Sequence, residues 1–241
     1  MKLIVSFVQY NTEKYPSSLL YLIKYLKKIK NHYVEIIVVD NKRSSNLFNP
    51  IIKDNITYID GDNTCWEFSG HTKVIEYLKS INDDYSSILF VNDSFLAPGG
   101  NDSPSVIIND NCVYECRKND KIIGNILDAE PYELIIDKYN IKKYMRTHCF
   151  MLSKNIINKI KTLVTLNIDF IDKCISSNAS YPYILLGAPI NSVAKNNIVR
   201  NLQLHWHSPI NIEKEWDFFR MKSLMLLNEL SLYTRITEDI G

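Results

Sequence analysis

The chain has 241 residues, of which 46% are apolar and 23% are charged, and its formal net charge is +1. This is an ordinary composition for a globular protein, and the length suffices for one large α/β domain. Because the charge is nearly neutral, no nucleic-acid partner is expected. Lys24, Lys27, Lys28 and Lys30 concentrate positive charge locally, and we interpret them as a solvated helix face.

The chain shows no pattern of a targeting or membrane-spanning segment. Its first residues lead directly into an apolar run, without the charged, apolar and small-residue order of a signal peptide. No stretch approaches the roughly 20 consecutive apolar residues of a membrane span. The five cysteines are scattered, and no second Cys or His pair completes a zinc set with Cys112 and Cys116. The sequence therefore predicts reduced thiols and a cytoplasmic location.

Strand and helix patterns alternate in the first half of the chain. Apolar runs predict the strands, and apolar residues at helical spacing predict the helices between them. The order strand, helix, strand, strand, helix, strand favours an α/β fold with a mostly parallel sheet flanked by crossover helices. We predict strands over 3–8, 34–39, 55–59 and 88–91, and helices over 17–29, with Ser17 as N-cap, and 69–81.

The second half is less regular. A loop is predicted over 96–104, a β-hairpin over 106–117, and a polar segment bordering the site over 130–139. A strand is predicted over 147–152, and helices over 154–163 and 168–176. Residues 216–235 carry a long apolar stripe at helical spacing, which favours core or subunit packing over a membrane surface. A peripheral membrane contact and a homo-oligomer both stay open.

Several predicted strands end on amide or carboxylate side chains. The carboxyl ends of parallel strands meet at one sheet edge, so these side chains predict a nucleotide-type crevice there. No GxGxxG or GxxxxGK[ST] motif occurs, which excludes a dinucleotide-binding turn and a P-loop. The lack of a glycine-rich loop after the first strand also disfavours a sugar nucleotidyltransferase. The strand ends are Gln9, Tyr10 and Asn11, then Asp40 and Asn41, and then Asn92, Asp93 and Ser94.

A nucleotide at this edge would be held by side chains and a divalent cation. Tyr10 is suited to stack on a base, and Asn11 and Asp40 to bond the base edge or the ribose hydroxyls. Asp93 is suited to hold Mg²⁺ or Mn²⁺ against a diphosphate. The competing interpretation is that these residues only cap strands and turns.

Residues 1 to about 95 resemble a GT-A glycosyltransferase, especially the family 2-like and rhamnan-synthesis-type enzymes of surface polysaccharides. The order and spacing of several short pieces carry the resemblance. They are Tyr10-Asn11 after the first strand, Val38 to Asn41 with Ser44 and Ser45 after the second, Asn63 and Glu67 to Gly70 leading into a helix, and Asn92 to Ser94 at the DxD position with Pro98 beyond.

The resemblance implies a single GT-A-like domain over 1–241, in which 1–100 bind the donor and 101–241 contact the acceptor. The implied reaction moves a sugar from a nucleoside diphosphate sugar to a hydroxyl of a glycan or glycolipid. Mn²⁺ or Mg²⁺ is the implied cofactor. The implied donor-binding residues are Gln9, Tyr10, Asn11, Asp40, Asn41, Asn63 and Asn92.

The metal motif departs from the family pattern, because Asp93 is its only acidic residue. Two interpretations therefore remain: the diphosphate is bound through a metal, or it is bound by basic side chains without a metal. His205 and His207 are candidate late metal ligands, or else a half-buried pair packed beside Trp206. Asp93→Ala is expected to remove metal-dependent donor binding and to leave the fold intact, since Asp93 follows a strand.

The acceptor side is less well defined. A general base is expected near the acceptor hydroxyl, and Asp128 and Glu130 are favoured over Asp169 and Asp172. His148 lies in a segment that resembles the acceptor region of the family. Trp66 is either an acceptor platform, since sugars stack on indole faces, or a packing residue.

Two other kinds of protein remain open. The first is a non-catalytic nucleotide-sugar-binding relative that lost the base and half of the metal motif. The second is an assembly subunit of a polysaccharide pathway, with the helix predicted over 216–235 as its interaction surface.

Overall fold

The computed structural model describes residues 1–10, 12–44, 50–96, 104–129, 134–160, 162–176, 184–185, 211 and 214–240. The chain divides into two compact units. Unit 1 comprises residues 1–125 and 146–163, and unit 2 comprises residues 126–145 and 164–241.

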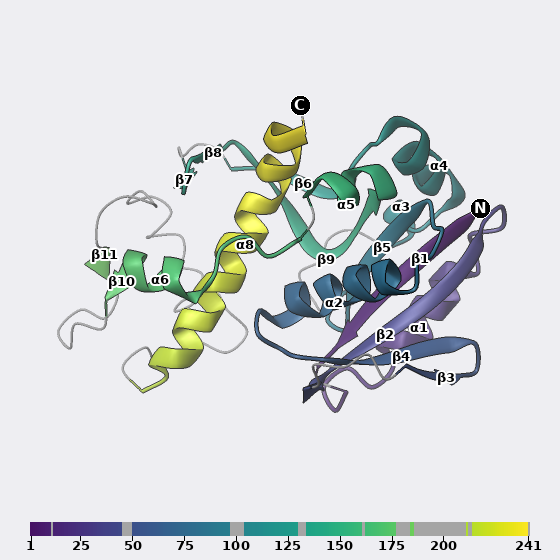
Figure 1. The fold of residues 1–241 in the computed structure, drawn as a ribbon, viewed down its shortest axis with the longest axis horizontal. Coiled ribbons are helices and arrows are strands. Elements are labelled where there is room, and N and C mark those ends of the chain that lie inside the picture. The colour runs from purple at the N-terminus through teal and green to yellow at the C-terminus, as the bar shows by residue number, and fades with distance from the viewer. Residues whose placement is uncertain are drawn as a thin grey trace. The chain divides into compact units, whose positions relative to one another are not determined.

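A mixed, mostly parallel sheet forms the centre of unit 1, with helices on its faces (Figure 1). Its strand order is β3-β4-β2-β1-β5-β9-β6. β1 is parallel to both β2 and β5, β2 is parallel to β4, β3 is antiparallel to β4, and β9 is antiparallel to β5. The α/β prediction is confirmed at this level. The elements are β1 (Lys2–Gln9), α1 (Ser18–Leu26), β2 (Tyr33–Ser44), β3 (Ile51–Lys53), β4 (Ile56–Gly61), α2 (Trp66–Ser80) and β5 (Ser87–Asn92).

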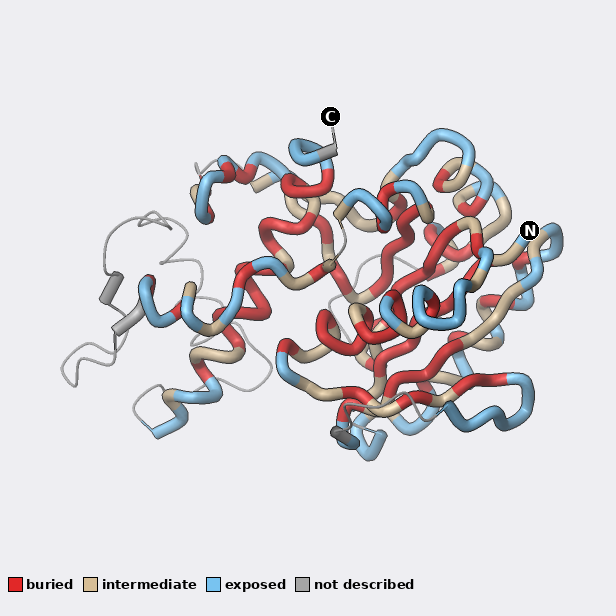
Figure 2. The backbone as a smooth tube through the Cα atoms, viewed as in Figure 1, coloured by how far each residue is buried: buried red, intermediate tan, exposed pale blue. Residues whose placement is uncertain are grey.

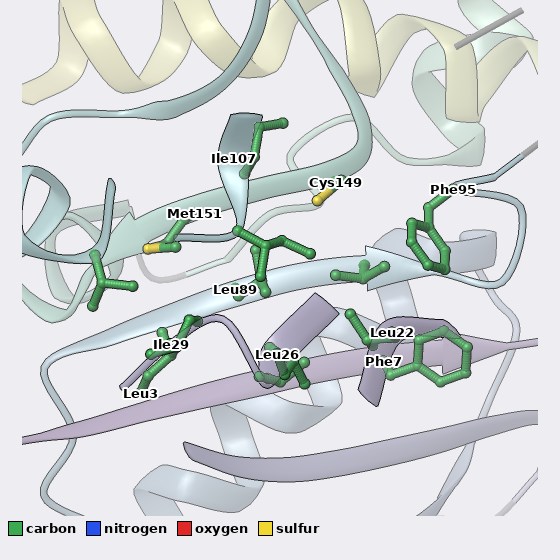
Figure 3. Close-up of a cluster of buried hydrophobic side chains, with 14 of the residues drawn as sticks. Leu3, Phe7, Leu22, Leu26, Ile29, Leu89, Phe95, Ile107, Cys149 and Met151 are labelled. Carbon is green, nitrogen blue, oxygen red and sulfur yellow. The ribbon is translucent and has the colours of Figure 1, made fainter. Parts of the chain in front are cut away.

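The alternation of side chains along β1 explains why helices cover both faces. Leu3, Val5 and Phe7 join a buried apolar cluster with Leu22 and Leu26 of α1 (Figure 3). The intervening residues of a strand point to the opposite face, where α2 packs. Because β1 is apolar on both sides, it lies at the centre of the sheet, and Figure 2 shows this centre buried while β3 is exposed at the edge.

Residues 104–119 are helical, so the hairpin predicted over 106–117 is wrong. The structure has α3 (Pro104–Ile107) and α4 (Asp110–Asn119). Asn109 is the N-cap of α4, and its side-chain oxygen accepts a hydrogen bond from the Cys112 N–H at 2.9 Å. An asparagine at the N-cap position favours a helix over the predicted hairpin.

The remaining elements complete unit 1 and form unit 2. In unit 2, Asn228 of the long helix α8 accepts hydrogen bonds from the backbone N–H groups of Thr165 and Leu166, each at 3.2 Å. The predicted 168–176 helix ends at Cys174 and continues as a short strand. The elements are β6 (Ile123–Asp128), β7 (Leu134–Ile136), β8 (Tyr139–Ile141), β9 (Lys143–Ser153), α5 (Lys154–Ile160), α6 (Ile168–Cys174), β10 (Ile175–Ser176), β11 (Ile184–Leu185) and α8 (Trp216–Ile240).

All five cysteines carry free thiols. Burial raises the pKa of Cys116 to about 12 and that of Cys149 to about 12. Among the residues that the structure describes, none of the helices combines the length and the apolar character that a membrane crossing requires.

Candidate functional site

The strand order creates a switch point between β1 and β5. After β1 the chain crosses through α1 to β2 on one side, and from β4 it crosses through α2 to β5 on the other side. α1 and α2 lie on opposite faces of the sheet (Figure 1). In open α/β sheets, ligands bind in the crevice outside the carboxyl ends of strands at such a point. The candidate site is therefore the end of β1 and β5.

Asp93 links these two strand ends. Its carboxylate Oδ2 accepts a hydrogen bond from the backbone N–H of Tyr10 at 2.8 Å. Its own backbone N–H donates to the Val8 carbonyl at 3.0 Å, and its carbonyl accepts from the Ser18 hydroxyl at 2.6 Å. Asp93 is buried, with 9% exposure. Its hydrogen bond to the Tyr10 N–H holds the chain where it leaves β1.

This geometry adds a stability cost to the expected effect of Asp93→Ala. Removing the carboxylate of the buried Asp93 would leave the Tyr10 N–H without this partner, which costs stability. The prediction of Ser17 as the N-cap of α1 is confirmed, although its side chain makes no capping hydrogen bond. Its neighbour Ser18 makes the stabilising contact at this helix start.

Tyr10 and Trp66 form a stacked aromatic pair at the same edge. Their ring centroids are 6.1 Å apart and the ring planes are inclined by 26°, within the range of favourable offset stacking. Tyr10 is 46% exposed. Tyr10 and Trp66 were predicted to contact different ligand parts, a base and an acceptor sugar, and the structure brings them together as one surface.

The backbone of Trp66 is strained. Its φ is 51°, in the left-handed region that disfavours bulky residues. Two side chains hold its carbonyl oxygen: Asn41 Nδ2 donates at 2.8 Å and Ser69 Oγ donates at 3.0 Å. Strain of this kind persists only where the surroundings over-determine the conformation, and such residues cluster at binding sites.

Asn41 is a buried anchor for Trp66, with 4% exposure. Its Oδ1 has no hydrogen-bond partner among the residues that the structure describes. The side chain fits because Gly61 lies against it: a Cβ at Gly61 would stand 2.1 Å from Asn41 Oδ1. A Cβ at Gly70 would likewise stand 2.8 Å from a Val8 methyl group, so α2 packs this close to β1 only with glycine there.

Three polar side chains line the neighbouring strand ends. Gln9 pairs with Asp40 across β1 and β2, and Asp40 pairs with Asp60 across β2 and β4. Asp40 Oδ1 accepts from the Lys42 N–H at 3.0 Å, and its Oδ2 lies 3.6 Å from Arg43 Nε. Paired residues of parallel strands share a face, so Gln9, Asp40 and Asp60 point to the same side of this edge.

The sequence analysis missed Asp60 and Asp62, although both follow the pattern of a strand that ends on carboxylates. Asp62 accepts hydrogen bonds from the backbone and the hydroxyl of Thr64 at 3.0 Å and 2.9 Å. Burial alone would raise the pKa of Asp62, but the bonds from Thr64 and Ser69 and the charge of Lys73 together lower that pKa. The predicted ligand Asn63 is half-buried in this turn, with φ of 53°.

Asn92 and His148 belong to the β5 side of unit 1. Asn92 pairs with Val8, and its Oδ1 accepts from the Ser94 hydroxyl at 3.0 Å. His148 is half-buried and precedes Cys149, which pairs with Val91. Both predicted residues therefore lie near the end of β5.

A histidine that no pattern singled out lies in the core beneath the site. His71 of α2 is fully buried, and its Nδ1 is 2.8 Å from Ser6 Oγ. Its ring meets Phe90 and Phe150 edge to face at 5.1 Å and 6.2 Å. Burial lowers the pKa of His71 to about 3, so the imidazole is neutral and serves packing.

The candidate general bases lie in unit 2 or outside the described residues. Asp128 is exposed and lies 3.8 Å from Lys143 Nζ. Asp172 accepts from Arg220 Nε at 2.8 Å, which ties α6 to α8, and Asp169 is exposed. Four predicted residues fall outside the described ranges: Asn11, Glu130, His205 and His207.

The divalent cation implied by the resemblance stays a prediction. Within the described ranges no group of three or more His, Cys, Asp or Glu side chains is placed to hold a metal. Asp93, the one acidic residue of the expected motif, already binds the Tyr10 N–H. Hard cations require several oxygen ligands, so we derive no step through Mn²⁺ or Mg²⁺.

The chain matches no family model, and no curated protein or solved structure matches it.

Proposed function

We propose that unit 1 binds a nucleoside diphosphate sugar at the carboxyl ends of β1 and β5, and that the protein is a GT-A-like glycosyltransferase. The observation that carries this proposal is the Tyr10–Trp66 pair, which presents an exposed aromatic surface beside the switch point. Every base offers a flat face to such a surface, and sugars stack on indole through their C–H groups.

The residues around the pair supply polar contacts for a bound donor. Gln9 and Asp40 offer an amide and a carboxylate at the carboxyl ends of β1 and β2, suited to ribose hydroxyls or a base edge. Asp93, Asn41 and Ser69 are positioning residues, because they bind the backbone of Tyr10 and Trp66. Catalysis in this proposal rests on holding the donor and an acceptor hydroxyl of a glycan or glycolipid in reacting geometry.

A second candidate is a nucleotide-sugar-binding relative without transferase activity. It is favoured by the engagement of the Asp93 carboxylate with the Tyr10 backbone N–H. This candidate keeps the same stacking surface and differs only in the chemistry that follows binding.

One experiment separates the two candidates. Purified protein is incubated with a panel of nucleoside diphosphate sugars, with and without Mn²⁺, and free nucleotide is measured over time. A transferase releases nucleotide from its donor by slow hydrolysis or by transfer, whereas a pure binder retains the donor intact. Release that Trp66→Ala does not diminish would contradict the proposed site.

A further inference from the structure

The outer side of α1 combines positive charge with exposed apolar side chains. Leu20 is 56% exposed and Tyr21 is 45% exposed, and both stand on the same helix as Lys24. Lys27 and Lys28 follow directly after the helix and are exposed. We name these residues the lysine face: Leu20, Tyr21, Lys24, Lys27 and Lys28.

The positive charges of the lysine face have no acidic residues near them in the sequence. Between Lys14 and Val34 the sequence contains no Asp or Glu, although the chain as a whole carries a formal charge of only +1. Glu13 and Glu35 flank the segment, and Lys2 pairs with Glu35 at 2.7 Å. From α4, Asp110 faces its far end, where its carboxylate accepts from the backbone N–H groups of Lys30 and Asn31.

The lysines lie over tyrosine rings. Lys24 Nζ is 5.0 Å from the centroid of the Tyr21 ring, and Lys28 Nζ is 5.2 Å from that of Tyr25. Such contacts hold the aliphatic stems along the aromatic surface and keep the ammonium groups in water. Apolar bodies with charged tips are characteristic of helices at the boundary of a lipid bilayer.

We propose that the lysine face docks on an anionic lipid surface. Charge complementarity favours this partner, since lysines near an anionic bilayer each contribute to binding and Leu20 and Tyr21 can enter the headgroup boundary. A nucleic acid is disfavoured for two reasons. The cations are lysines without the bidentate fork of arginine, and one face of Tyr21 and of Tyr25 is covered by a lysine instead of being open to a base.

The helix that carries the lysine face begins at the candidate site. Ser18, in the first turn of α1, donates to the Asp93 carbonyl at 2.6 Å, so the start of this helix is tied to the end of β5. Docking through α1 would therefore bring the β1 and β5 ends close to the bilayer. The proposal goes beyond the proposed function and stands without it, because lipid binding needs no donor.

The test is flotation of the full-length protein with vesicles of phosphatidylcholine alone or mixed with phosphatidylglycerol, at low and high salt. We expect binding to the anionic vesicles only, weakened by salt. Replacing Lys24, Lys27 and Lys28 with Gln should weaken it roughly a hundredfold, at roughly fivefold per lysine. The matched control replaces the exposed Lys53, Lys79 and Lys121 with Gln and should bind like the wild type.

Two further measurements complete the test. Leu20→Ser combined with Tyr21→Ser should weaken binding at high salt as well, because it removes the apolar contribution. Urea denaturation of every variant verifies that it folds. We expect all variants to fold, because the substituted positions are exposed. The proposal is overturned if wild-type protein ignores anionic vesicles, if the lysine variant binds as well as the control, or if only a single-stranded oligonucleotide is bound.

Discussion

The Asp93 carboxylate accepts a hydrogen bond from the Tyr10 backbone N–H at 2.8 Å, across 83 positions of sequence. This bond fixes the point where the chain leaves β1, and Tyr10 in turn stacks on Trp66. The residue expected to hold a metal therefore orients the aromatic surface on which the proposed function depends.

Asp93→Ala should destabilise the protein by about 1–2 kcal/mol, because the partly buried hydrogen bond from the Tyr10 N–H is lost. Asp93→Asn retains a side-chain oxygen and should cost less. Urea denaturation of both variants measures the difference. If the alanine variant and the wild type have equal free energies of unfolding, the hydrogen bond between Asp93 and the Tyr10 N–H does not stabilise the fold. Donor binding retained by Asp93→Asn would favour the positioning role over a metal role.

Trp66→Gly should be more stable than Trp66→Ala by about 1 kcal/mol, since glycine adopts a positive φ without the steric cost that a Cβ brings. Both variants lose the indole, so they form a matched pair in which only backbone strain differs. Chemical denaturation provides the two free energies of unfolding. A glycine variant less stable than the alanine variant would mean that the φ of 51° stores no strain.

Gly61→Ala should destabilise the protein by about 1–3 kcal/mol through overpacking against Asn41. In an Asn41→Ala background the same substitution should cost less, because the nearest atom to the added Cβ, Asn41 Oδ1 at 2.1 Å, is then missing. A double-mutant cycle measures this coupling. Additive costs would indicate that the two residues do not share the close contact.

Acid should destabilise the protein through His71. Its pKa is about 3 in the folded state and about 6.5 when unfolded, so the unfolded chain binds the proton first. The contribution of the neutral His71 to the free energy of unfolding is thus fully present above pH 6.5, and it is lost as the pH falls toward 3. Between pH 7 and pH 5 this loss amounts to about 2 kcal/mol.

The matched variant for this effect is His71→Gln, which keeps a hydrogen-bonding group toward Ser6 and does not titrate. The free energy of unfolding is measured from pH 7 to pH 5, above the range in which most carboxylates titrate. His32 also has a pKa lowered by burial, so the difference in slope between variant and wild type is the test. Identical slopes would contradict a neutral, buried His71.

The buried strands could be predicted from the sequence because apolar runs such as 3–8 and 88–91 admit only a central position in a sheet. The prediction failed at 106–117, where a hairpin was expected but Pro104–Ile107 is helical and Asn109 caps the helix that begins at Asp110. The hairpin prediction gave no weight to Asn109 as an N-cap.

The site was predictable only in part. The strand-end pattern located its edge, since Gln9, Asp40 and Asp93 all stand at carboxyl ends of neighbouring strands. The roles of individual residues depend on contacts between distant segments that no local pattern encodes. Asn41 looked like a ligand, yet it is buried as an anchor for the Trp66 carbonyl. The Tyr10–Trp66 pair likewise required the docking of α2 beside β1.

The most direct test of the donor site is a thermal-shift screen of nucleoside diphosphate sugars against wild type, Tyr10→Ala, Trp66→Ala and a control, Tyr33→Ala. Tyr33 is 66% exposed but stands at the amino end of β2, away from the proposed site. A ligand that binds only the native state raises its melting temperature, and losing one stacking contact weakens binding by about 1–3 kcal/mol. We predict that at least one donor stabilises the wild type and Tyr33→Ala and stabilises the two site variants much less. A donor shift of equal size in all four proteins, or no shift with any donor, would contradict the proposed site.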